Sequence, residues 1–371
     1  MSTPGPTFML ERRYFLDADI YRRETDRIFR RRWLQVGRAA QLPAAGSFVT
    51  VEIEGEHLIL LRDREKHLRA FHNHCRHRGT RLCNEPAGQL GTHITCPYHA
   101  WSYSLDGRLQ GAPHMEETPG FSKADYPLHA VACAEWDGHI FVHLDAKPAP
   151  FEQTFAPVLT KFAPWHVHEL VCARTVEYDV AANWKLIVQN YSECYHCPII
   201  HPALNEHSHY RAAKNDLTEG PFLGGPMRIT RDGGGLTRTG QRCAPPLPGV
   251  KGEDLQHAYY YLIFPSFLIS LQPDFVLTHR LIRKGAGRTQ IVCQWFYHPE
   301  AVAAPGFDPS AAVDFWDQIN REDWKLCELS QAGIQSTACS PGPYSTLESM
   351  PAAFDREYLA AMTGDSAAAP A

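Results

Sequence analysis

Residues 71–109, FHNHCRHRGTRLCNEPAGQLGTHITCPYHAWSYSLDGRL, contain two short motifs that decide the fold of the first part of the chain. Cys75 and His77 form a C-x-H motif, and Cys96 and His99 form a C-x2-H motif. Two thiolates and two neutral imidazoles from two loops are four soft ligands with no open position. The pattern therefore indicates a structural or electron-transfer metal site rather than a Lewis acid.

Two kinds of metal site compete for these four residues. Zinc accepts the same ligands, but structural zinc usually takes at least one pair from a C-x2-4-C motif, which this stretch lacks. A Rieske [2Fe–2S] cluster needs two cysteines on one iron and two histidines on the other, and one Cys and one His from each loop meet that need. The remaining candidates are interpreted as loop and packing residues: His72, His74, Cys83 and His93.

The sequence on both sides of these motifs is typical of β strands. Residues 47–63, SFVTVEIEGEHLILLRD, and residues 138–144, GHIFVHL, are runs of strand-forming residues separated by turn residues. After residue 151 the pattern changes to helical segments, then to a glycine-rich stretch from Gly220 to Gly252, and then to long strands. We therefore predict an α+β chain in which a β domain precedes an α+β domain.

Charge excludes one class of partner. The 371-residue chain holds 36 Lys and Arg against 41 Asp and Glu, a formal charge of −5, so a nucleic-acid partner is not expected. Six arginines gather near the N-terminus, where they form either a solvated helix face or a docking surface for an acidic partner. They are Arg22, Arg23, Arg27, Arg30, Arg31 and Arg32.

No segment predicts passage through a membrane. Residues 1–15 lack the apolar core of a signal peptide, and the most apolar stretch, residues 258–271, is short and contains Pro265. The 11 cysteines are odd in number and unevenly spaced, which favours reduced thiols over a disulfide framework. We expect a cytoplasmic protein whose last residues, 366–371, are disordered.

A second group of metal-binding side chains lies in residues 190–202, NYSECYHCPIIHP. Glu193 and His196 are three positions apart and would share one face of a helix. Pro198 removes a backbone donor and should end or kink that helix after His196, which lets His201 turn toward the same metal. Two imidazoles leave such a site short of ligands, and non-haem iron takes a carboxylate as the third ligand in a 2-His-1-carboxylate triad.

A candidate for the third ligand lies in a helix predicted to begin at Asp308 and Pro309. Asp323 falls in the register of the apolar stripe of this helix, so it is expected to be buried and to need a partner. That partner is either a metal or a buried hydrogen bond. The stripe consists of Val313, Trp316, Asn320, Asp323, Trp324 and Cys327, and the acids outside it, Asp314, Asp317 and Glu322, are interpreted as solvated.

The two motif regions resemble the Rieske-type non-haem iron oxygenases. CRHRG and CPYHAW, followed by Tyr103 and Gly107, resemble the two loops of the Rieske domain of these enzymes. NWKLIVQNYSECYHCPIIHP, residues 183–202, resembles their catalytic motif, and the resemblance extends from Trp33 to about Leu347. It implies an all-β Rieske domain at residues 33–148, a catalytic α+β domain at residues 149–371 with an antiparallel sheet of the helix-grip type, and an N-terminal helical segment, residues 1–32, that packs on the catalytic domain.

The resemblance also implies a role for each candidate residue. Glu193 takes the bridging position between a ligand of the iron and a Rieske histidine, where most members carry aspartate and the branch acting on quaternary ammonium compounds carries glutamate. Asn190 is implied as a further residue of the catalytic site, and Cys194 and Cys197 as packing residues. The implied ligands are Cys75, His77, Cys96 and His99 for the [2Fe–2S] cluster, and His196, His201 and Asp323 for Fe(II).

Partners follow from the same resemblance. Electrons are expected to come from NAD(P)H through a separate flavin- and iron–sulfur-containing reductase or a ferredoxin, because no GxGxxG motif follows a predicted strand in this chain. They would pass through His99 and Glu193 to the iron, where O2 is the cosubstrate. Since the two metal sites of one chain are too far apart in this family, a head-to-tail homotrimer is implied.

The substrate remains open between two classes. A quaternary ammonium compound such as a betaine would be hydroxylated on an N-methyl group, and the alternative is hydroxylation of an aromatic compound or aromatic acid.

The stretch from Gly220 to Gly252 is either a lid or a surface loop. An electron-transfer or zinc-stabilised structural protein is a second class of function, but it leaves Glu193, His196 and His201 unused. A candidate aromatic pocket, or an ordinary sheet core, is formed by Tyr259, Tyr260, Tyr261, Phe264, Phe267, Phe275, Trp295 and Phe296.

Overall fold

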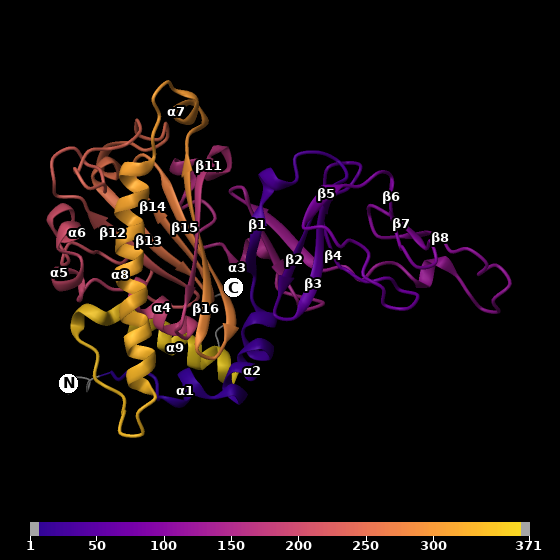
Figure 1. Cartoon of the computed structure of the whole chain (residues 1–371), viewed down its shortest axis with the longest axis horizontal. Helices are drawn as coiled ribbons and strands as arrows, with labels where there is room; N and C mark the ends of the chain where they lie inside the picture. Colours follow the sequence, from indigo (N-terminus) through magenta and orange to yellow (C-terminus); the bar gives the residue numbers. More distant parts are fainter. Residues whose placement is uncertain (1–6, 365–371) are drawn as a thin grey trace. The chain divides into compact units, whose positions relative to one another are not determined.

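The computed structural model describes residues 7–364 (Figure 1). The chain divides into two compact units, and each is described by itself. The smaller unit is Phe29–Phe151, and the larger unit joins the residues up to Ile28 with those from Glu152 onward. The disorder expected for residues 366–371 lies outside the described residues.

The smaller unit consists of antiparallel strands. Its four-stranded sheet has the order β4-β3-β2-β5, and two three-stranded sheets have the orders β1-β10-β9 and β6-β7-β8. The strands are β1 (Leu34–Arg38), β2 (Ser47–Ile53), β3 (Glu56–Arg62), β4 (Leu68–His72), β5 (Ala87–Gln89), β6 (His93–Thr95), β7 (Ser102–Ser104), β8 (Leu109–Gly111), β9 (Ala132–Trp136) and β10 (His139–His143). Short 3-10 turns are Phe29–Arg31, Ala39–Gln41 and Lys123–Asp125.

The hairpin between β2 and β3 shows how the sequence fixes this unit. Glu54 and Gly55 form its two-residue loop, and both have positive φ angles, of 50° and 80°, as a tight hairpin turn requires. Along β3, Leu58 and Leu60 face one apolar core, whereas Ile59 and Leu61 face a second. The second core lies beneath the loops of the two Cys/His motifs and includes their cysteines.

The larger unit is built on one six-stranded antiparallel sheet of order β11-β16-β15-β14-β13-β12. Its strands are β11 (Val171–Val180), β12 (Phe222–Arg228), β13 (His257–Ile263), β14 (Phe267–Leu271), β15 (Val276–Gly285) and β16 (Arg288–Tyr297). The predicted α+β class, with an all-β first part and an antiparallel sheet in the second, is confirmed. Within the glycine-rich stretch, residues 222–228 form β12, so this part is neither a lid nor a surface loop.

Helices pack on this sheet, and the long helix α8 runs along it in Figure 1. The helix predicted at Asp308 is α8, which begins at Ser310, and the Asp308 side chain accepts from the Ser310 N–H at 2.9 Å. A further helix, α9, follows it in the chain. The helices are α1 (Arg13–Leu16), α2 (Ala18–Arg27), α3 (Phe151–Thr154), α4 (Trp184–Tyr191), α5 (Cys197–Ile200), α6 (Pro202–His207), α7 (Pro299–Ala303), α8 (Ser310–Ile334) and α9 (Ser349–Thr363), with 3-10 turns at Ala163–Trp165, Val167–Glu169, Gly252–Gln256 and Thr346–Glu348.

One fully buried carboxylate, Glu24 of α2, holds the N-terminal segment to the larger unit. It accepts hydrogen bonds from Trp184 Nε1 at 3.0 Å, Arg283 NH1 at 3.0 Å and Tyr358 OH at 2.8 Å, and it pairs with Lys185 Nζ. Four donors from α4, β15 and α9 therefore converge on one side chain of α2. A buried charge is stable only when it is paired in this way.

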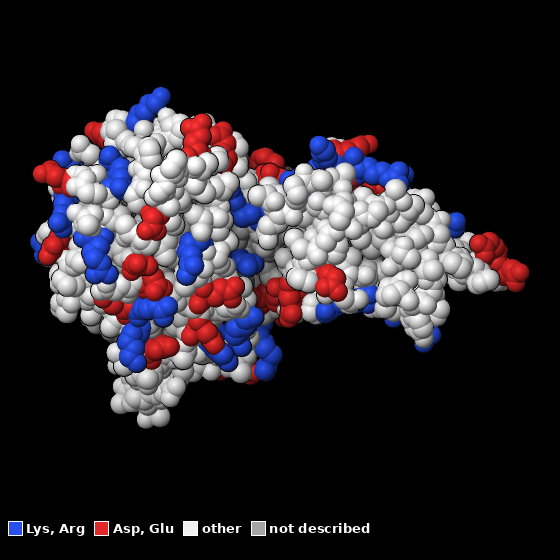
Figure 2. Space-filling model, turned by 45° about the horizontal axis from the view of Figure 1, so that its top comes forward, with Lys and Arg blue, Asp and Glu red and all other residues white. Residues whose placement is uncertain are grey.

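The outer surface carries mixed charge. Figure 2 shows acidic and basic side chains interspersed over the visible face of the larger unit. In the N-terminal basic cluster Arg22 pairs with Asp19, Arg30 with Glu56 and Arg31 with Asp145. These pairs favour the solvated-face alternative for the cluster. None of the described helices is long and apolar enough to cross a membrane.

Candidate active site

Three side chains, from two short connecting segments and one helix, converge at one point of the larger unit. His201 Nε2 lies 2.8 Å and His196 Nε2 lies 3.2 Å from the same oxygen, Oδ1 of Asp323. His196 directly precedes α5, His201 lies between α5 and α6, and Asp323 lies on α8. Two imidazoles and one carboxylate whose ligand atoms lie within 4.8 Å of one another form the donor set of a 2-His-1-carboxylate iron site.

The backbone before these ligands differs from the sequence expectation. Helix α4 ends at Tyr191 rather than after His196, and Ser192 Oγ donates to the Val188 carbonyl at 2.6 Å. Glu193 and His196 therefore meet across a turn and not along a helix face. Helix α5 then begins at Cys197 with Pro198 in its first turn, where a residue without a backbone donor is tolerated.

Each imidazole is oriented by a second carboxylate. Glu193 Oε1 lies 2.6 Å from His196 Nδ1, and Glu322 Oε2 lies 2.6 Å from His201 Nδ1. A carboxylate at Nδ1 keeps that nitrogen protonated and leaves the Nε2 lone pair for a metal. The interpretation of Glu322 as a solvated residue was therefore wrong.

The pKa values of these groups are shifted by their mutual hydrogen bonds and charges. Burial lowers the pKa of His196, but the carboxylates of Asp323 and Glu193 outweigh burial and raise it to about 10. Burial would raise the pKa of Asp323, but its hydrogen bonds from the two imidazoles lower it below its ordinary value. Protons on the imidazoles thus balance the carboxylates where a divalent metal could do so.

The loops of the smaller unit bring the four Cys/His ligands together in two pairs. Cys75 lies within hydrogen-bonding reach of Cys96, and both are buried. The rings of His77 and His99 lie 4.8 Å apart and are exposed. Tyr103 OH lies 3.2 Å from Cys75 Sγ and accepts from the Arg76 N–H at 3.0 Å, which ties the first loop to β7. A pair of thiols beside a pair of imidazoles fits a [2Fe–2S] cluster with different ligands on its two irons.

A cavity of about 220 Å³ opens beside the His196, His201 and Asp323 group. Glu193 and Asn190 also line it, and Asn190 Oδ1 is buried without a hydrogen-bond partner among the described residues. Further lining residues are Tyr191, Tyr210, Arg211, Tyr260, His279, Trp316, Asn320 and Trp324. The cavity is thus apolar and aromatic around a few polar groups, as small-molecule sites commonly are.

Of the two alternatives for the eight aromatic residues, a substrate pocket or an ordinary sheet core, the sheet core holds for most of them. Of the eight aromatic residues proposed, Tyr260 alone lines the cavity. Tyr259 and Tyr261 stack on each other at 6.5 Å, as expected of alternate residues that share the opposite face of β13. The other proposed side chains are buried, among them Trp295 and Phe275. The rings that do line the cavity include Trp316 and Trp324, from the stripe of α8 that carries Asp323.

Cys194 and Cys197 form a disulfide, with Sγ atoms 1.96 Å apart, which corrects the expectation that all thiols are reduced. The turn after α4 brings the Cα atoms of these residues to 4.9 Å, within the usual distance for a disulfide. Both residues line the cavity and flank His196. The remaining cysteines described are free.

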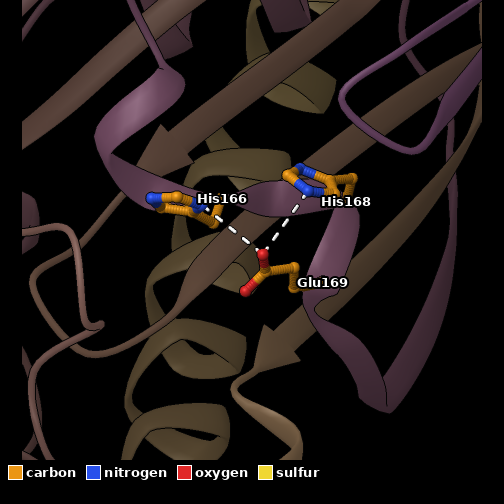
Figure 3. A group of neighbouring side chains, drawn as sticks. All are labelled: His166, His168 and Glu169. Carbon is orange, nitrogen blue, oxygen red and sulfur yellow. Dashed lines mark ion pairs between the residues drawn. The ribbon is translucent and has the colours of Figure 1, made fainter.

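A second group of possible ligands lies on the surface (Figure 3). Glu169 Oε1 lies 3.6 Å from His166 Nδ1 and 3.5 Å from His168 Nε2. All three side chains are about half exposed and are neighbours in sequence. We assign no metal to them, because such ion pairs form readily on a solvated surface without one.

Comparison with known proteins places both units. Residues 32–124 match the Rieske [2Fe-2S] domain, and residues 167–364 match the ring hydroxylating alpha subunit (catalytic domain). The glycine betaine monooxygenase oxygenase subunit of Chromohalobacter salexigens is 29% identical over 367 residues, covering 90% of this chain and 80% of that protein. The carnitine monooxygenase oxygenase subunit of Escherichia coli K12 is 35% identical over 207 residues, covering 55% of each chain.

Solved structures share the fold. The quaternary ammonium Rieske monooxygenase CntA in complex with L-carnitine has a TM-score of 0.77 and 22% identity, covering 96% of this chain and 95% of that chain. Naphthalene 1,2-dioxygenase from Rhodococcus bound to indole has the same TM-score with 17% identity, covering 97% of this chain and 95% of that chain. Enzymes whose ligands differ this widely show the architecture and not the substrate.

Proposed function

This chain belongs to the family of ring-hydroxylating alpha subunits and carries a Rieske domain, and from that premise we propose that it hydroxylates an N-methyl group of a small quaternary ammonium compound. It is the oxygenase component of a multicomponent enzyme that requires a reductase. The alternative of an electron-transfer or zinc-stabilised protein is wrong, since the catalytic family model covers the part of the chain that holds His196, His201 and Asp323.

The ligand sets proposed for the two cofactors are those expected from the sequence. The [2Fe–2S] cluster would be held by Cys75, His77, Cys96 and His99. A mononuclear iron would be bound by His196 and His201 through Nε2 and by Asp323 through its carboxylate. When bound, these groups supply electron transfer and O2 activation.

The side chains of the chain itself would do three things. Glu193 and Glu322 keep the two imidazoles in the tautomer that offers Nε2. The cavity walls exclude bulk water and hold the substrate beside the three ligands. Glu193, hydrogen-bonded to His196, would also lie on the path by which electrons pass from a Rieske histidine such as His99 to the iron.

The observation that carries the choice of substrate is the aromatic wall of the cavity. The rings of Tyr191 and Tyr260 lie 6.2 Å apart, and those of Tyr260 and Trp316 also lie 6.2 Å apart. Faces of Trp and Tyr attract quaternary ammonium groups by cation–π interaction. Glycine betaine monooxygenase oxygenase subunits and a choline monooxygenase match over most of this chain, and all of them are named for quaternary ammonium compounds. The alternative of an aromatic substrate draws support from shared fold alone.

The reaction has a distinctive product. O2 and two electrons, with two protons, convert one N-methyl group to N-hydroxymethyl and release water. The carbinolamine then loses formaldehyde and a proton and leaves a tertiary amine with two N-methyl groups. An aromatic substrate would give a phenol or a diol without formaldehyde.

Two features of the assembly belong to the same proposal. NAD(P)H would deliver electrons through a flavin- and iron–sulfur-containing reductase or a ferredoxin. Three copies of the chain would form a head-to-tail ring in which the cluster of one copy serves the iron of the next. A solved relative is described in terms of inter-subunit electron transfer, which supports this arrangement.

O2 uptake with a surrogate reductase tests the function. Betaines, carnitine and choline would be compared with benzoate-type acids. Formaldehyde released in step with O2 uptake is the expected result. A phenol or diol formed without formaldehyde would reject the N-methyl assignment and establish the aromatic alternative.

A further inference from the structure

The charged side chains around the cavity are few and unevenly distributed. Apart from histidines, its lining contains two acids, Glu193 and Asp323, and one cation, Arg211. Both acids are engaged with His196 or His201. Arg211 is therefore the one cationic side chain, histidines excepted, that the described lining offers to a ligand.

The guanidinium of Arg211 is not neutralised by the protein. It lies 5.3 Å from the centre of the Tyr210 ring, and no carboxylate of the described residues lies within ion-pair distance of it. A ring face positions a guanidinium without cancelling its charge. Such a group can still bind a carboxylate with two parallel hydrogen bonds.

The segment that carries Arg211 is held against β12. Lys214 N donates to the Pro226 carbonyl at 2.8 Å, and Leu217 N donates to the Gly224 carbonyl at 3.1 Å. A Cβ atom at Gly225 would lie 2.5 Å from the Lys214 carbonyl oxygen, so only glycine permits this close approach. The glycines of β12 thus let residues 213–217 lie on the strand and place Arg211 at the cavity.

The cavity therefore combines two kinds of recognition group. The rings of Tyr191, Tyr260 and Trp316 suit a quaternary ammonium group, and Arg211 suits an anion. Resting on the function proposed above, we propose that Arg211 is a carboxylate subsite and that the enzyme prefers trimethylammonium substrates carrying a carboxylate over those ending in an alcohol or amide. This preference separates the betaine and carnitine type of substrate from the choline type.

A paired comparison of substrates and variants tests the subsite. γ-Butyrobetaine and glycine betaine would each be compared with the matching carboxamide, by kcat/KM from formaldehyde release and by calorimetric binding. In Arg211→Gln the carboxylates should lose about 10- to 100-fold, the size of one charge-assisted interaction, and the carboxamides should change little. Arg211→Lys should recover part of the loss.

Lys214→Gln is the matched control. Lys214 is an exposed cation on the same segment, but it does not line the cavity. Removing it changes the net charge equally and should leave the preference for carboxylates intact. An equal loss in both variants would mean that Arg211 acts only through general electrostatic attraction, and the subsite would be rejected.

The possible failures can be told apart. If the unmodified enzyme releases formaldehyde and Arg211→Gln affects carboxylates and carboxamides alike, the function stands and the subsite is wrong. If no N-methyl compound yields formaldehyde, the function proposed above is wrong. Binding of a benzoate-type acid and its amide to Arg211→Gln then decides the subsite, because a selective loss of the acid keeps it and equal binding rejects it.

Discussion

The two candidate metal centres meet solvent in opposite ways. In the Rieske loops the cysteines are buried while the rings of His77 and His99 are exposed, beside a Tyr98 that is 56% exposed. In the catalytic group the His201 side chain is 1% exposed, and both imidazoles are held by carboxylates. An exposed imidazole edge suits electron exchange with another protein, whereas a buried, carboxylate-held site suits controlled chemistry on a small molecule.

The largest expected effect separates the two centres completely. Asp323→Ala and His201→Ala should abolish turnover and iron binding in the catalytic unit while leaving the visible Rieske spectrum unchanged. Cys96→Ser and His99→Ala should do the reverse and bleach the spectrum. Absorbance and iron content measured on the same samples check this, and loss of the spectrum in Asp323→Ala would show that the ligands are divided wrongly.

A second prediction tests the link between the centres. Glu193→Gln keeps the size of the side chain and removes its charge, so at saturating Fe(II) both metals should be bound while electron transfer slows strongly. Rapid mixing with substrate and O2 measures reoxidation of the cluster. A reoxidation rate equal to that of the unmodified enzyme would remove Glu193 from the electron path.

Glu322 should matter for the catalytic centre alone. Glu322→Gln weakens the carboxylate that orients His201, and removal of such a partner typically costs about 10- to 100-fold in metal affinity or activity. Iron affinity measured by competition with a chelator checks this, with Asp314→Asn as the control on an exposed face of the same helix. Equal affinities for the two variants would contradict a role for Glu322.

The last prediction concerns pH, whose effect is the smallest when it is taken for a single pH unit. The pKa of His196 in the metal-free protein is raised to about 10, so the imidazole carries a proton at neutral pH that a metal must displace. The protonated His196 imidazole stabilises the folded, metal-free protein. This contribution is fully present below pH 6.5 and is lost as pH rises through about 10. Fe(II) affinity should therefore rise with pH over this window, by at most about tenfold per unit for each proton displaced.

Proton release on metal binding measures this linkage directly. Calorimetry of Fe(II) binding in two buffers of different ionisation enthalpy gives the number of protons released, without requiring turnover. Near neutral pH we expect at least one. Release of none would contradict the raised pKa of His196.

The contrast between the centres also explains what the sequence could predict. The Rieske motifs are local, because each loop supplies one Cys and one His within a few residues. The register of Asp323 on α8 predicted a buried acid that needs either a metal or a hydrogen-bond partner, and the resemblance to the oxygenases implied an iron ligand. Glu322 was missed because it falls outside that stripe, although its neighbour Asp323 and the need of His201 for an Nδ1 partner were available signals.

Other errors arose from structural details that the apolar pattern of the sequence does not encode. The end of α4 at Tyr191 depends on the Ser192 back-bond, and the disulfide depends on the turn that follows. Helix α9 was not predicted from the sequence. It has Pro351 in its first turn and is buried on most of its surface, so its apolar residues do not follow a clear helical period. The pocket and the sheet core stayed open as alternatives for the aromatic residues, because the strand pattern does not tell which face of β13 is directed toward the metal ligands.

The four donors that converge on Glu24 determine which fragments of the chain can be expected to fold. The match to the Rieske domain begins at residue 32 and the match to the catalytic domain at residue 167, so a recombinant chain begun at Arg32 would keep both matched regions intact. It would nevertheless lose the carboxylate that neutralises Lys185 and Arg283 and would leave two buried cations facing each other, directly before the segment that carries Glu193 and His196. The smallest working catalytic piece must therefore include α2, even though the Rieske unit separates it from the rest of that piece in the sequence.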